Sequence, residues 1–381
     1  MQYIIGVAGL ALVFGMAFIV SNDRKKIKYR PIITMLVLQF VLGFLLLNTS
    51  AGNVLISTIA NGFTALLNCA REGINFVFGR LANPDDPIFF MSVLMPITFI
   101  STLIGILQHW HILPFIIKYI GLALSKVNGM GKLESYNAVA SAILGQSEVF
   151  ISVKKLLGPL PPNRLYTLCA SAMSTVSMSI VGAYMVMIEP KYVVTALVLN
   201  PYEVKPEDDI LVVAETKRQS FFEMLGEYIL DGFKVGVIVC AMLIGFVGII
   251  TLINNVFLGI IGISFQEILG YLFSPFAFFM GIPMAECVDA ASLMATKIVA
   301  NEFVAMMQLS SGTVILSAKS VAIVSIFLVS FANFSSIGII AGAVKALNEE
   351  KGNVVACFGL RLLYGATLVS ILNATIVGLI I

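Results

Sequence analysis

Long apolar runs separated by short polar segments dominate the sequence. A membrane-spanning helix needs about 20 mainly apolar residues. Seven runs approach or exceed that length, at 3–20, 31–47, 91–108, 164–188, 228–252, 321–347 and 354–381. An eighth, at 192–199, is much shorter. The pattern predicts an all-α polytopic membrane protein with about eight transmembrane helices. The mixed segments 53–80 and 111–125 favour interfacial helices.

Two segments are too polar to be ordinary spans. Residues 133–157 and 281–307 carry carboxylates, amides and lysines, and their apolar stretches reach about ten residues, too short to cross as helix. Irregular backbone at membrane depth is tolerated only where protein or a wet cavity covers it. We therefore predict two re-entrant hairpins, the first with its polar tip at 145–148.

Each predicted hairpin is followed by an apolar run that a polar cluster interrupts. The clusters lie at 174–179, with four hydroxyls in six positions, and at 331–336. Hydroxyl side chains can bond the carbonyls that are freed where a helix unwinds. Paired discontinuous segments in two halves indicate a secondary transporter whose site lies near the membrane midplane, in an inverted-repeat transport domain.

Composition excludes several classes of protein. Hydrophobic residues make up 59% of the chain and charged residues 12%, against about 25% in soluble domains. A soluble enzyme, a disordered chain and a nucleic-acid-binding protein are therefore excluded, and nucleic acid is not expected as a partner. The five cysteines are scattered and the two histidines flank Trp110, so we predict no metal site and no cofactor.

The placement of charge predicts the orientation. Five basic residues lie at 24–30, between the first two apolar runs. By the positive-inside rule this loop is cytoplasmic, so the N-terminus lies outside. The first run has neither a basic n-region nor a small-residue cleavage site, and we interpret it as a span rather than a removable signal.

Two carboxylates are the leading candidates for chemistry. A charge near the bilayer centre costs at least about 2.5–3.5 kcal/mol, so Glu148 and Glu302 need a compensating role. A carboxylate can accept hydrogen bonds from a polar substrate, and a desolvated one can carry a proton. The alternative is a structural pair of Lys297 with Glu302 or Asp289. The 331–336 cluster, with aromatic rings beside amide and hydroxyl groups, suits a flat polar ring bearing a sugar, or simple helix packing.

Three motifs carry a resemblance to a known family. Gly-Gln-Ser-Glu at 145–148, Asn-Glu-Phe-Val at 301–304 and Phe-Ala-Asn-Phe-Ser-Ser at 331–336 resemble the hairpin and core-helix motifs of the concentrative nucleoside transporters, bacterial nucleoside permease branch. Residues 125–133 and 173–184 are also similar. The resemblance implies eight spans, two hairpins and interfacial helices, assembled as a homotrimer in the bacterial cytoplasmic (inner) membrane. It also implies nucleoside import by an elevator motion, and no enzyme activity.

The resemblance also implies roles for individual residues. In this pattern Gln146, Ser147 and Glu148 bind the base, and Ile180 lines an apolar pocket beside it. Glu302 binds ribose hydroxyls. The remaining contacts come from the second core helix: a ring contact from Phe331 and ribose contacts from Asn333 and Ser336.

The chain departs from the sodium-coupled pattern before the first hairpin tip. Sodium-coupled members have a motif similar to Asn-x-x-Val there. In this chain Ser141 takes the place of the Asn and Leu144 that of the Val. A hard cation wants several oxygen ligands, and the remaining contributors would be the Ser141 hydroxyl and carbonyls near Thr175 and Val176. We therefore favour coupling to protons (H+), with Glu302 or Glu148 as the carrier; coupling to sodium (Na+) is the alternative.

The resemblance divides the chain into four regions. We expect scaffold spans and an interfacial helix at 1–110, and the first half of a transport domain at 111–200. A polar loop and a scaffold span follow at 201–264, and the second half occupies 265–381. The family has a full span where residues 192–199 lie, so we expect the chain to lack roughly a dozen residues there.

Two rival functions remain open. An intramembrane hydrolase would need two carboxylates that share a proton, and a passive channel would not accumulate substrate. The preference for purine or pyrimidine nucleosides is also open, because both bases present donors and acceptors.

Overall fold

The computed structural model describes residues 2–21, 29–82, 88–128, 132–199, 220–312 and 314–381. None of these residues lies in a β-strand. Six helical segments are long and apolar enough to cross a membrane, at Tyr3–Val20, Ser50–Ala82, Phe90–His109, Pro162–Met187, Phe221–Ile261 and Gly359–Ile380. Shorter apolar helices lie at Ile32–Asn48, Ala318–Leu328 and Phe334–Leu347. The predicted all-α polytopic membrane fold is confirmed.

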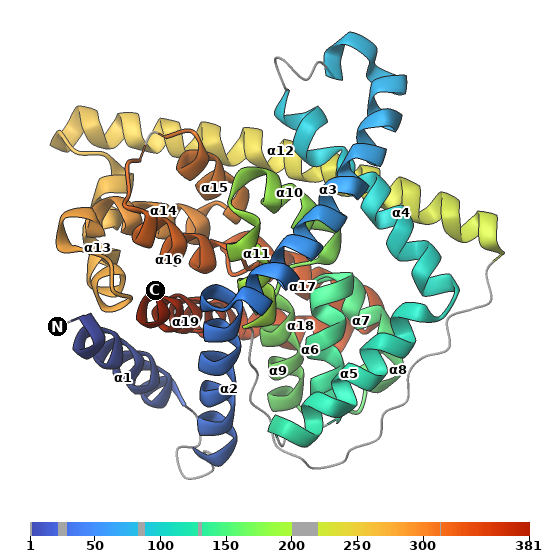
Figure 1. Ribbon diagram of the computed structural model, residues 1–381, viewed down its shortest axis with the longest axis horizontal. Coiled ribbons are helices and arrows are strands. Elements are labelled where there is room, and N and C mark those ends of the chain that lie inside the picture. Colours follow the sequence, from blue (N-terminus) through green and yellow to red (C-terminus); the bar gives the residue numbers. More distant parts are fainter. Residues whose placement is uncertain (1, 22–28, 83–87, 129–131, 200–219, 313) are drawn as a thin grey trace.

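The N-terminal helices flank the molecule. Helix α1 (Gln2–Val20) packs beside the last helix, so the two termini lie close together (Figure 1). Helix α2 (Tyr29–Asn48) leads into α3 (Ser50–Phe78), whose buried residues recur every three or four positions or multiples of this spacing. This single stripe is what an amphipathic helix requires. The basic residues 24–28 lie outside the described part of the chain, so the orientation stays a prediction.

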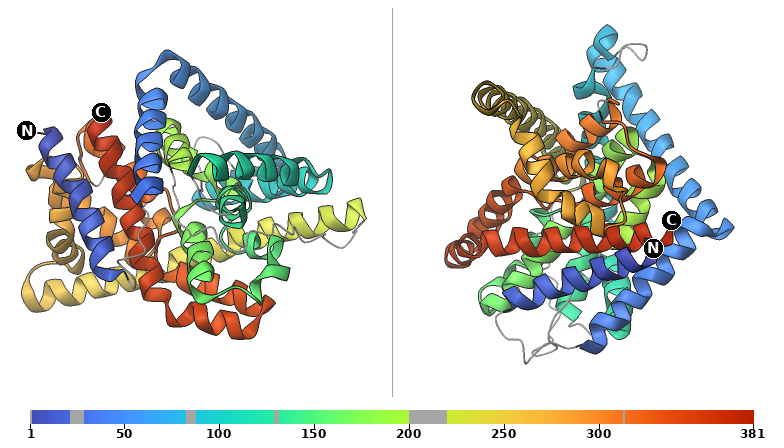
Figure 2. Two further views of the ribbon diagram at one scale, coloured as in Figure 1. Left: turned by 90° about the horizontal axis from the view of Figure 1, so that it is seen from below. Right: turned by 90° about the vertical axis from the view of Figure 1, so that its left-hand side faces the viewer.

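One helix is much longer than the sequence predicts. The expected span at 228–252 is part of α12 (Phe221–Ile261), a helix of 41 residues that crosses the width of the molecule (Figure 2). The Ser220 hydroxyl caps its start and Gly262, with φ +77°, ends it. Helix α12 crosses α4 (Pro96–His109) at Gly232, where a Cβ would come within 2.8 Å of the Thr98 Cα. A small residue therefore allows the close contact.

The first hairpin and the first broken helix follow α5 (Ile112–Asn128). The hairpin consists of α6 (Lys132–Leu144), α7 (Glu148–Ser152) and α8 (Lys154–Leu157), and its break lies at the predicted tip. The broken helix consists of α9 (Pro162–Ser174) and α10 (Met178–Met187).

The short apolar segment is a short helix. Helix α11 (Pro190–Val198) has nine residues, and Val193 and Thr195 are fully buried in it. The carbonyl of Leu199, just after the helix, accepts a hydrogen bond from the Gln39 side chain on α2. The polar loop expected at the start of the 201–264 region lies outside the described residues, which resume at Ser220.

The second half repeats the pattern. After α13 (Phe265–Phe279) and a short 3₁₀ turn (Met284–Glu286), the second hairpin consists of α14 (Cys287–Val299) and α15 (Glu302–Ser310). The second broken helix consists of α16 (Ala318–Leu328) and α17 (Phe334–Leu347).

The last predicted span begins later than expected. The run at 354–381 is divided into α18 (Glu349–Cys357) and α19 (Gly359–Ile380). Asn348 both ends α17 and caps α18, so the chain turns sharply there. Gly352 then lies against Lys345, where a Cβ would meet the backbone at 2.4 Å. Helix α18 is therefore folded back on α17, and the span starts at Gly359.

Burial separates the interior from the outer helices. The fully buried large side chains include Phe150 and Tyr184 of the first half and Phe303 and Phe327 of the second. In contrast, α12 exposes large apolar side chains along much of its length, among them Phe222, Leu230, Ile244 and Ile260. Exposed apolar surface of this extent is typical of contact with lipid or with other subunits.

Candidate functional site

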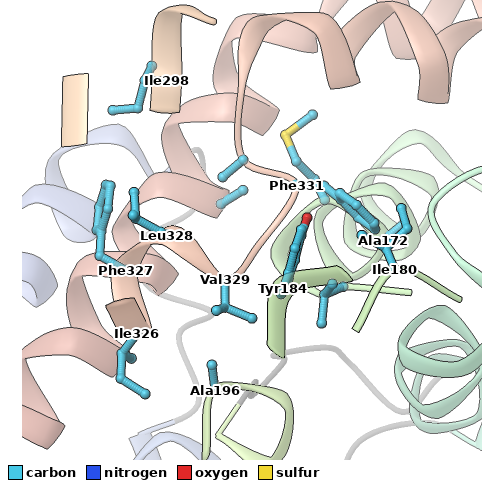
Figure 3. Close-up of a cluster of buried hydrophobic side chains, with 14 of the residues drawn as sticks. Ala172, Ile180, Tyr184, Ala196, Ile298, Ile326, Phe327, Leu328, Val329 and Phe331 are labelled. Atoms are coloured by element: carbon cyan, nitrogen blue, oxygen red, sulfur yellow. The ribbon is translucent and has the colours of Figure 1, made fainter. Parts of the chain in front are cut away.

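The two helix breaks touch each other. The first break lies between Ser174 and Met178, and the second between Leu328 and Phe334. The backbone N–H of Phe331 in the second break donates to the carbonyl of Thr175 in the first, at 3.1 Å. Figure 3 shows Phe331 beside Ala172, Ile180 and Tyr184 of the first broken helix. Segments more than 150 residues apart therefore meet at one place.

Glu302 lies at this meeting point. It is the first residue of α15, and only 4% of its surface is exposed. The Tyr184 hydroxyl donates to its Oε1 atom at 2.7 Å, and the Asn333 amide donates to its Oε2 atom at 2.8 Å. Both halves of the chain thus contribute to the environment of one carboxylate.

Local sequence fixes these groups by capping. Asn333 is the N-cap of α17, and its Oδ1 atom accepts from the Ser336 N–H and the Ser335 hydroxyl. Because Oδ1 is committed to the helix, the Nδ2 group faces Glu302 as a donor. Asn301 caps α15 in the same way, through the N–H of Val304. The partial positive charge of a helix N-terminus also favours a carboxylate at this position.

The contacts determine where Glu302 could hold a proton. Oε2 faces a fixed N–H donor, which cannot accept a hydrogen bond from a protonated oxygen. Oε1 faces the Tyr184 hydroxyl, which can either donate or accept. A proton on Glu302 would therefore be held at Oε1, with the Tyr184 hydroxyl turned to accept it.

The first hairpin tip closes on the first break. Gly145 has φ +119°, a backbone conformation that residues other than glycine rarely adopt. It reverses the direction of the chain after α6. The Ser177 hydroxyl donates to the carbonyl of Leu144 at 3.1 Å. Helix α7, which begins at Glu148, contacts α17. The hairpin tip is therefore close to both broken helices.

The structure locates the other predicted site residues around this point. Gln146 is half-buried at the tip, and its Oε1 atom has no hydrogen-bond partner among the described residues. The buried Ser336 hydroxyl likewise has none there. Ile180 and Phe331 are buried, and the Ser147 carbonyl accepts from the Phe150 N–H. The structure describes the backbone of Glu148 but not its side chain.

Comparison with known proteins decides the family. Residues 172–378, more than half of the chain, match the family described as "Na+ dependent nucleoside transporter C-terminus". Residues 8–81 match the corresponding N-terminus, and residues 90–191 match "Nucleoside recognition". The chain belongs to the concentrative nucleoside transporter family.

Curated relatives agree with this membership. The purine nucleoside transport protein NupG of Bacillus subtilis is 36% identical over 397 aligned residues, which cover 100% of both chains. The nucleoside permease NupC of Helicobacter pylori is 30% identical over 98% of this chain and 97% of its own. Since this family consists of transporters, the intramembrane hydrolase is ruled out.

Solved structures of one family member have the same fold. The inward-facing, substrate-bound structure of CNTnw is 26% identical, with a TM-score of 0.92 over 100% of this chain and 99% of that one. An outward-facing variant of CNTnw is 27% identical, with a TM-score of 0.93. The resemblance stated from the motifs is confirmed, and the fold is that of a transporter solved in both orientations.

The positions expected to bind sodium, if sodium were the coupling ion, are hydrogen-bonded to other groups of the protein. The Ser141 hydroxyl donates to the Asn137 carbonyl at 2.6 Å. The carbonyl of Leu144 accepts from Ser177, and that of Thr175 accepts from Phe331. Ser141, Thr175 and Val176 are buried. Elsewhere in the described ranges, no three His, Cys, Asp or Glu side chains are grouped so as to hold a metal.

Sequence reasoning missed Tyr184, and it left open a direct pair between Lys297 and an acidic side chain, which the structure does not form among the residues it describes. Tyr184 stands in an otherwise apolar stretch, and a buried tyrosine hydroxyl usually requires a partner; that signal could have identified it. Lys297 was weighed as a partner of Glu302 or Asp289, but its ammonium contacts α16 and α19 instead. Asp289 is exposed, and Glu286 accepts from the backbone N–H and hydroxyl of Ser317.

Proposed function

We propose that the protein imports nucleosides by symport with protons across the bacterial cytoplasmic membrane. The observation that carries the proposal is the buried Glu302 carboxylate, held by Tyr184 and Asn333 where the two broken helices meet. Half-helix N-termini and unwound backbone at such a crossing are typical of substrate sites in secondary transporters.

The donors and acceptors around this point suit a nucleoside. A carboxylate oxygen has two lone pairs, so Glu302 keeps the capacity to accept from ribose hydroxyls after its two protein contacts. The Ser336 hydroxyl and the Gln146 Oε1 atom are buried polar groups that gain from a polar ligand. Phe331 and Ile180 provide apolar surface for a base, and Ser147 and Glu148 lie at the same tip.

Two observations support protons rather than sodium as the coupling ion. The carbonyls of Leu144 and Thr175 each already accept one hydrogen bond from the chain, so each keeps a single lone pair for a cation that needs several oxygen ligands. Glu302 also has one oxygen, Oε1, whose partner can reverse its hydrogen bond. We propose that Glu302 carries the proton at Oε1; Glu148 is the alternative carrier, and sodium held by Ser141, Leu144, Thr175 and Val176 is the alternative ion.

Further parts of the proposal follow from the family. We propose an elevator motion in which residues 111–200 and 265–381 move against a scaffold, within a homotrimer whose N-termini lie outside. The exposed apolar surface of α12 supports contact with lipid or neighbouring subunits. One relative is named as a purine nucleoside transporter, so purine nucleosides come first in a substrate panel.

Uptake into proteoliposomes tests the coupling ion. We expect radiolabelled adenosine or uridine to accumulate when a pH gradient, acidic outside, is imposed in choline buffer. A protonophore should abolish this accumulation, because it removes the driving force. Accumulation that follows an imposed sodium gradient and ignores the pH gradient would show sodium coupling. Equilibration without accumulation under both gradients would indicate a passive channel.

A further inference from the structure

Lys297 is a buried cation that the proposed function does not use. It lies on α14, two residues before the helix ends, and its surface exposure is 0%. Burying an ammonium group in a dry interior carries a large desolvation cost unless it is paired and fully hydrogen-bonded. Its surroundings therefore have to provide both hydrogen-bond acceptors and compensating charge.

Three acceptors surround the ammonium. Nζ donates to the Phe327 carbonyl at 2.8 Å, to the Ser330 hydroxyl at 2.7 Å and to the Ser370 hydroxyl at 3.2 Å. It also lies 4.4 Å from the centre of the Phe327 ring, where the ring face attracts a cation. Three acceptors match the three N–H groups of a lysine ammonium, so the side chain is satisfied in its charged form.

The position of this cation relates it to the second break. In an uninterrupted helix, the carbonyl of Phe327 would accept from the N–H of Phe331. That N–H is bonded to Thr175 of the first break instead. The ammonium of Lys297 therefore donates to the carbonyl that the unwinding leaves free. This bond links α14 to the end of α16, and the bond to Ser370 links α14 to α19.

The compensating charge is Glu302, five residues further along the same hairpin. Both groups lie at the second break, since Lys297 donates to Phe327 and Ser330 and Glu302 accepts from Asn333. Lys297 has no carboxylate within ion-pair distance in the described part of the chain. The carboxylate oxygens are instead bonded to Tyr184 and Asn333. Glu302 thus gains a counter-charge without having its oxygens covered by a lysine.

We propose that Lys297 is a positioning residue of the substrate site, a built-in cation that closes the second helix break and supplies the counter-charge of Glu302. The proposal deepens the proposed function, because it rests on Glu302 as the residue that binds the nucleoside. Lys297 itself does not contact the substrate. It affects binding by compensating the charge of Glu302 and by fixing the geometry of the break that carries Asn333.

A double-mutant cycle on the purified full-length protein tests this role. The variants are Lys297→Met, Glu302→Gln and the double variant, measured for melting temperature and for binding of radiolabelled adenosine and uridine. Each single variant leaves one buried charge uncompensated and should lower the melting temperature by on the order of 5–10 °C. The double variant should melt above Lys297→Met, because it buries neither charge.

Binding separates the positioning role from a general loss of fold. Lys297→Met should weaken binding by about 30-fold or more, as expected when one member of a buried charge pair is removed. Lys319→Met is the matched control, since Lys319 also donates to a backbone carbonyl, that of Gly378 on α19, at 2.9 Å but lies at the other end of α16. It should change affinity by no more than about threefold.

The outcomes distinguish the two proposals. If Glu302→Gln loses binding but Lys297→Met binds like the wild type, or if the melting shifts of the cycle simply add, the role of Lys297 is overturned. If Glu302→Gln binds both nucleosides like the wild type, the proposed function itself fails. If Lys297→Met yields no monodisperse protein, recovery of such protein in the double variant supports the charge pairing, and no recovery counts against it.

Discussion

The two broken helices solve the same problem by different means. Each unwinding frees backbone carbonyls in a region where few water molecules are available to bond them. At the first break, neutral groups bond these carbonyls: the Thr175 hydroxyl bonds Ala172, and the Phe331 N–H bonds Thr175. At the second break, the Lys297 ammonium bonds Phe327. One break is closed by neutral donors and the other by a fixed charge.

The difference indicates a division of labour between the halves. The half that holds the fixed cation also holds Glu302, the carboxylate that we place at the substrate. The half whose break is bonded by neutral groups contributes Tyr184, whose hydroxyl can change between donor and acceptor. The second half therefore sets the charge of the site, and the first half supplies the group that can respond to a proton.

The largest expected effect comes from adding a charge to the second break. Asn333→Asp replaces the Nδ2 donor with a carboxylate oxygen facing Glu302 Oε2, now 2.8 Å from the amide. Two carboxylates so close cannot both ionise, although aspartate still caps α17. We expect nucleoside affinity to fall by about 100-fold or more at pH 7.5, since each tenfold loss is 1.4 kcal/mol. Affinity within about threefold of the wild type would contradict the contact.

A smaller effect sharpens the comparison between the breaks. Ser330→Ala removes an acceptor from a buried ammonium, a contact worth about 1.5–3 kcal/mol. Ser174→Ala, beside the first break, removes one neutral bond, from the Ser174 hydroxyl to the Ala170 carbonyl, worth about 0.5–1.5 kcal/mol. The same substitution at both breaks should therefore lower the melting temperature more at Ser330. Equal shifts, or a larger one at Ser174, would show that the second break does not depend on its cation.

Much of this arrangement could be predicted from local sequence. Short apolar stretches around polar tips predicted both hairpins, and hydroxyl and amide clusters predicted both breaks within a few residues. These features depend on how polarity varies along the chain. The length of α12 could not be predicted in the same way, because the helix continues through 221–227 and 253–261, where acidic or amide side chains interrupt the apolar run.

Contacts between distant segments could not be predicted. Nothing in the chain near Tyr184 indicates that its hydroxyl faces Glu302, 118 positions away. Lys297 and Glu302 are close in sequence, which suggested a direct pair, but the turn between α14 and α15 directs their side chains to different partners. The partner of a buried polar group is decided by tertiary packing, and sequence alone shows only that a partner is needed.

Nucleoside binding by Glu302→Gln is the most direct test of the central claim, that the carboxylate at the meeting point of the two breaks binds the substrate. The matched control is Glu286→Gln, because Glu286 precedes the same hairpin and its carboxylate accepts from the backbone N–H and hydroxyl of Ser317. With radiolabelled adenosine and uridine at pH 7.5, we expect Glu302→Gln to lose at least about 100-fold in affinity, and Glu286→Gln to bind like the wild type. Binding by Glu302→Gln within about threefold of the wild type would contradict the account.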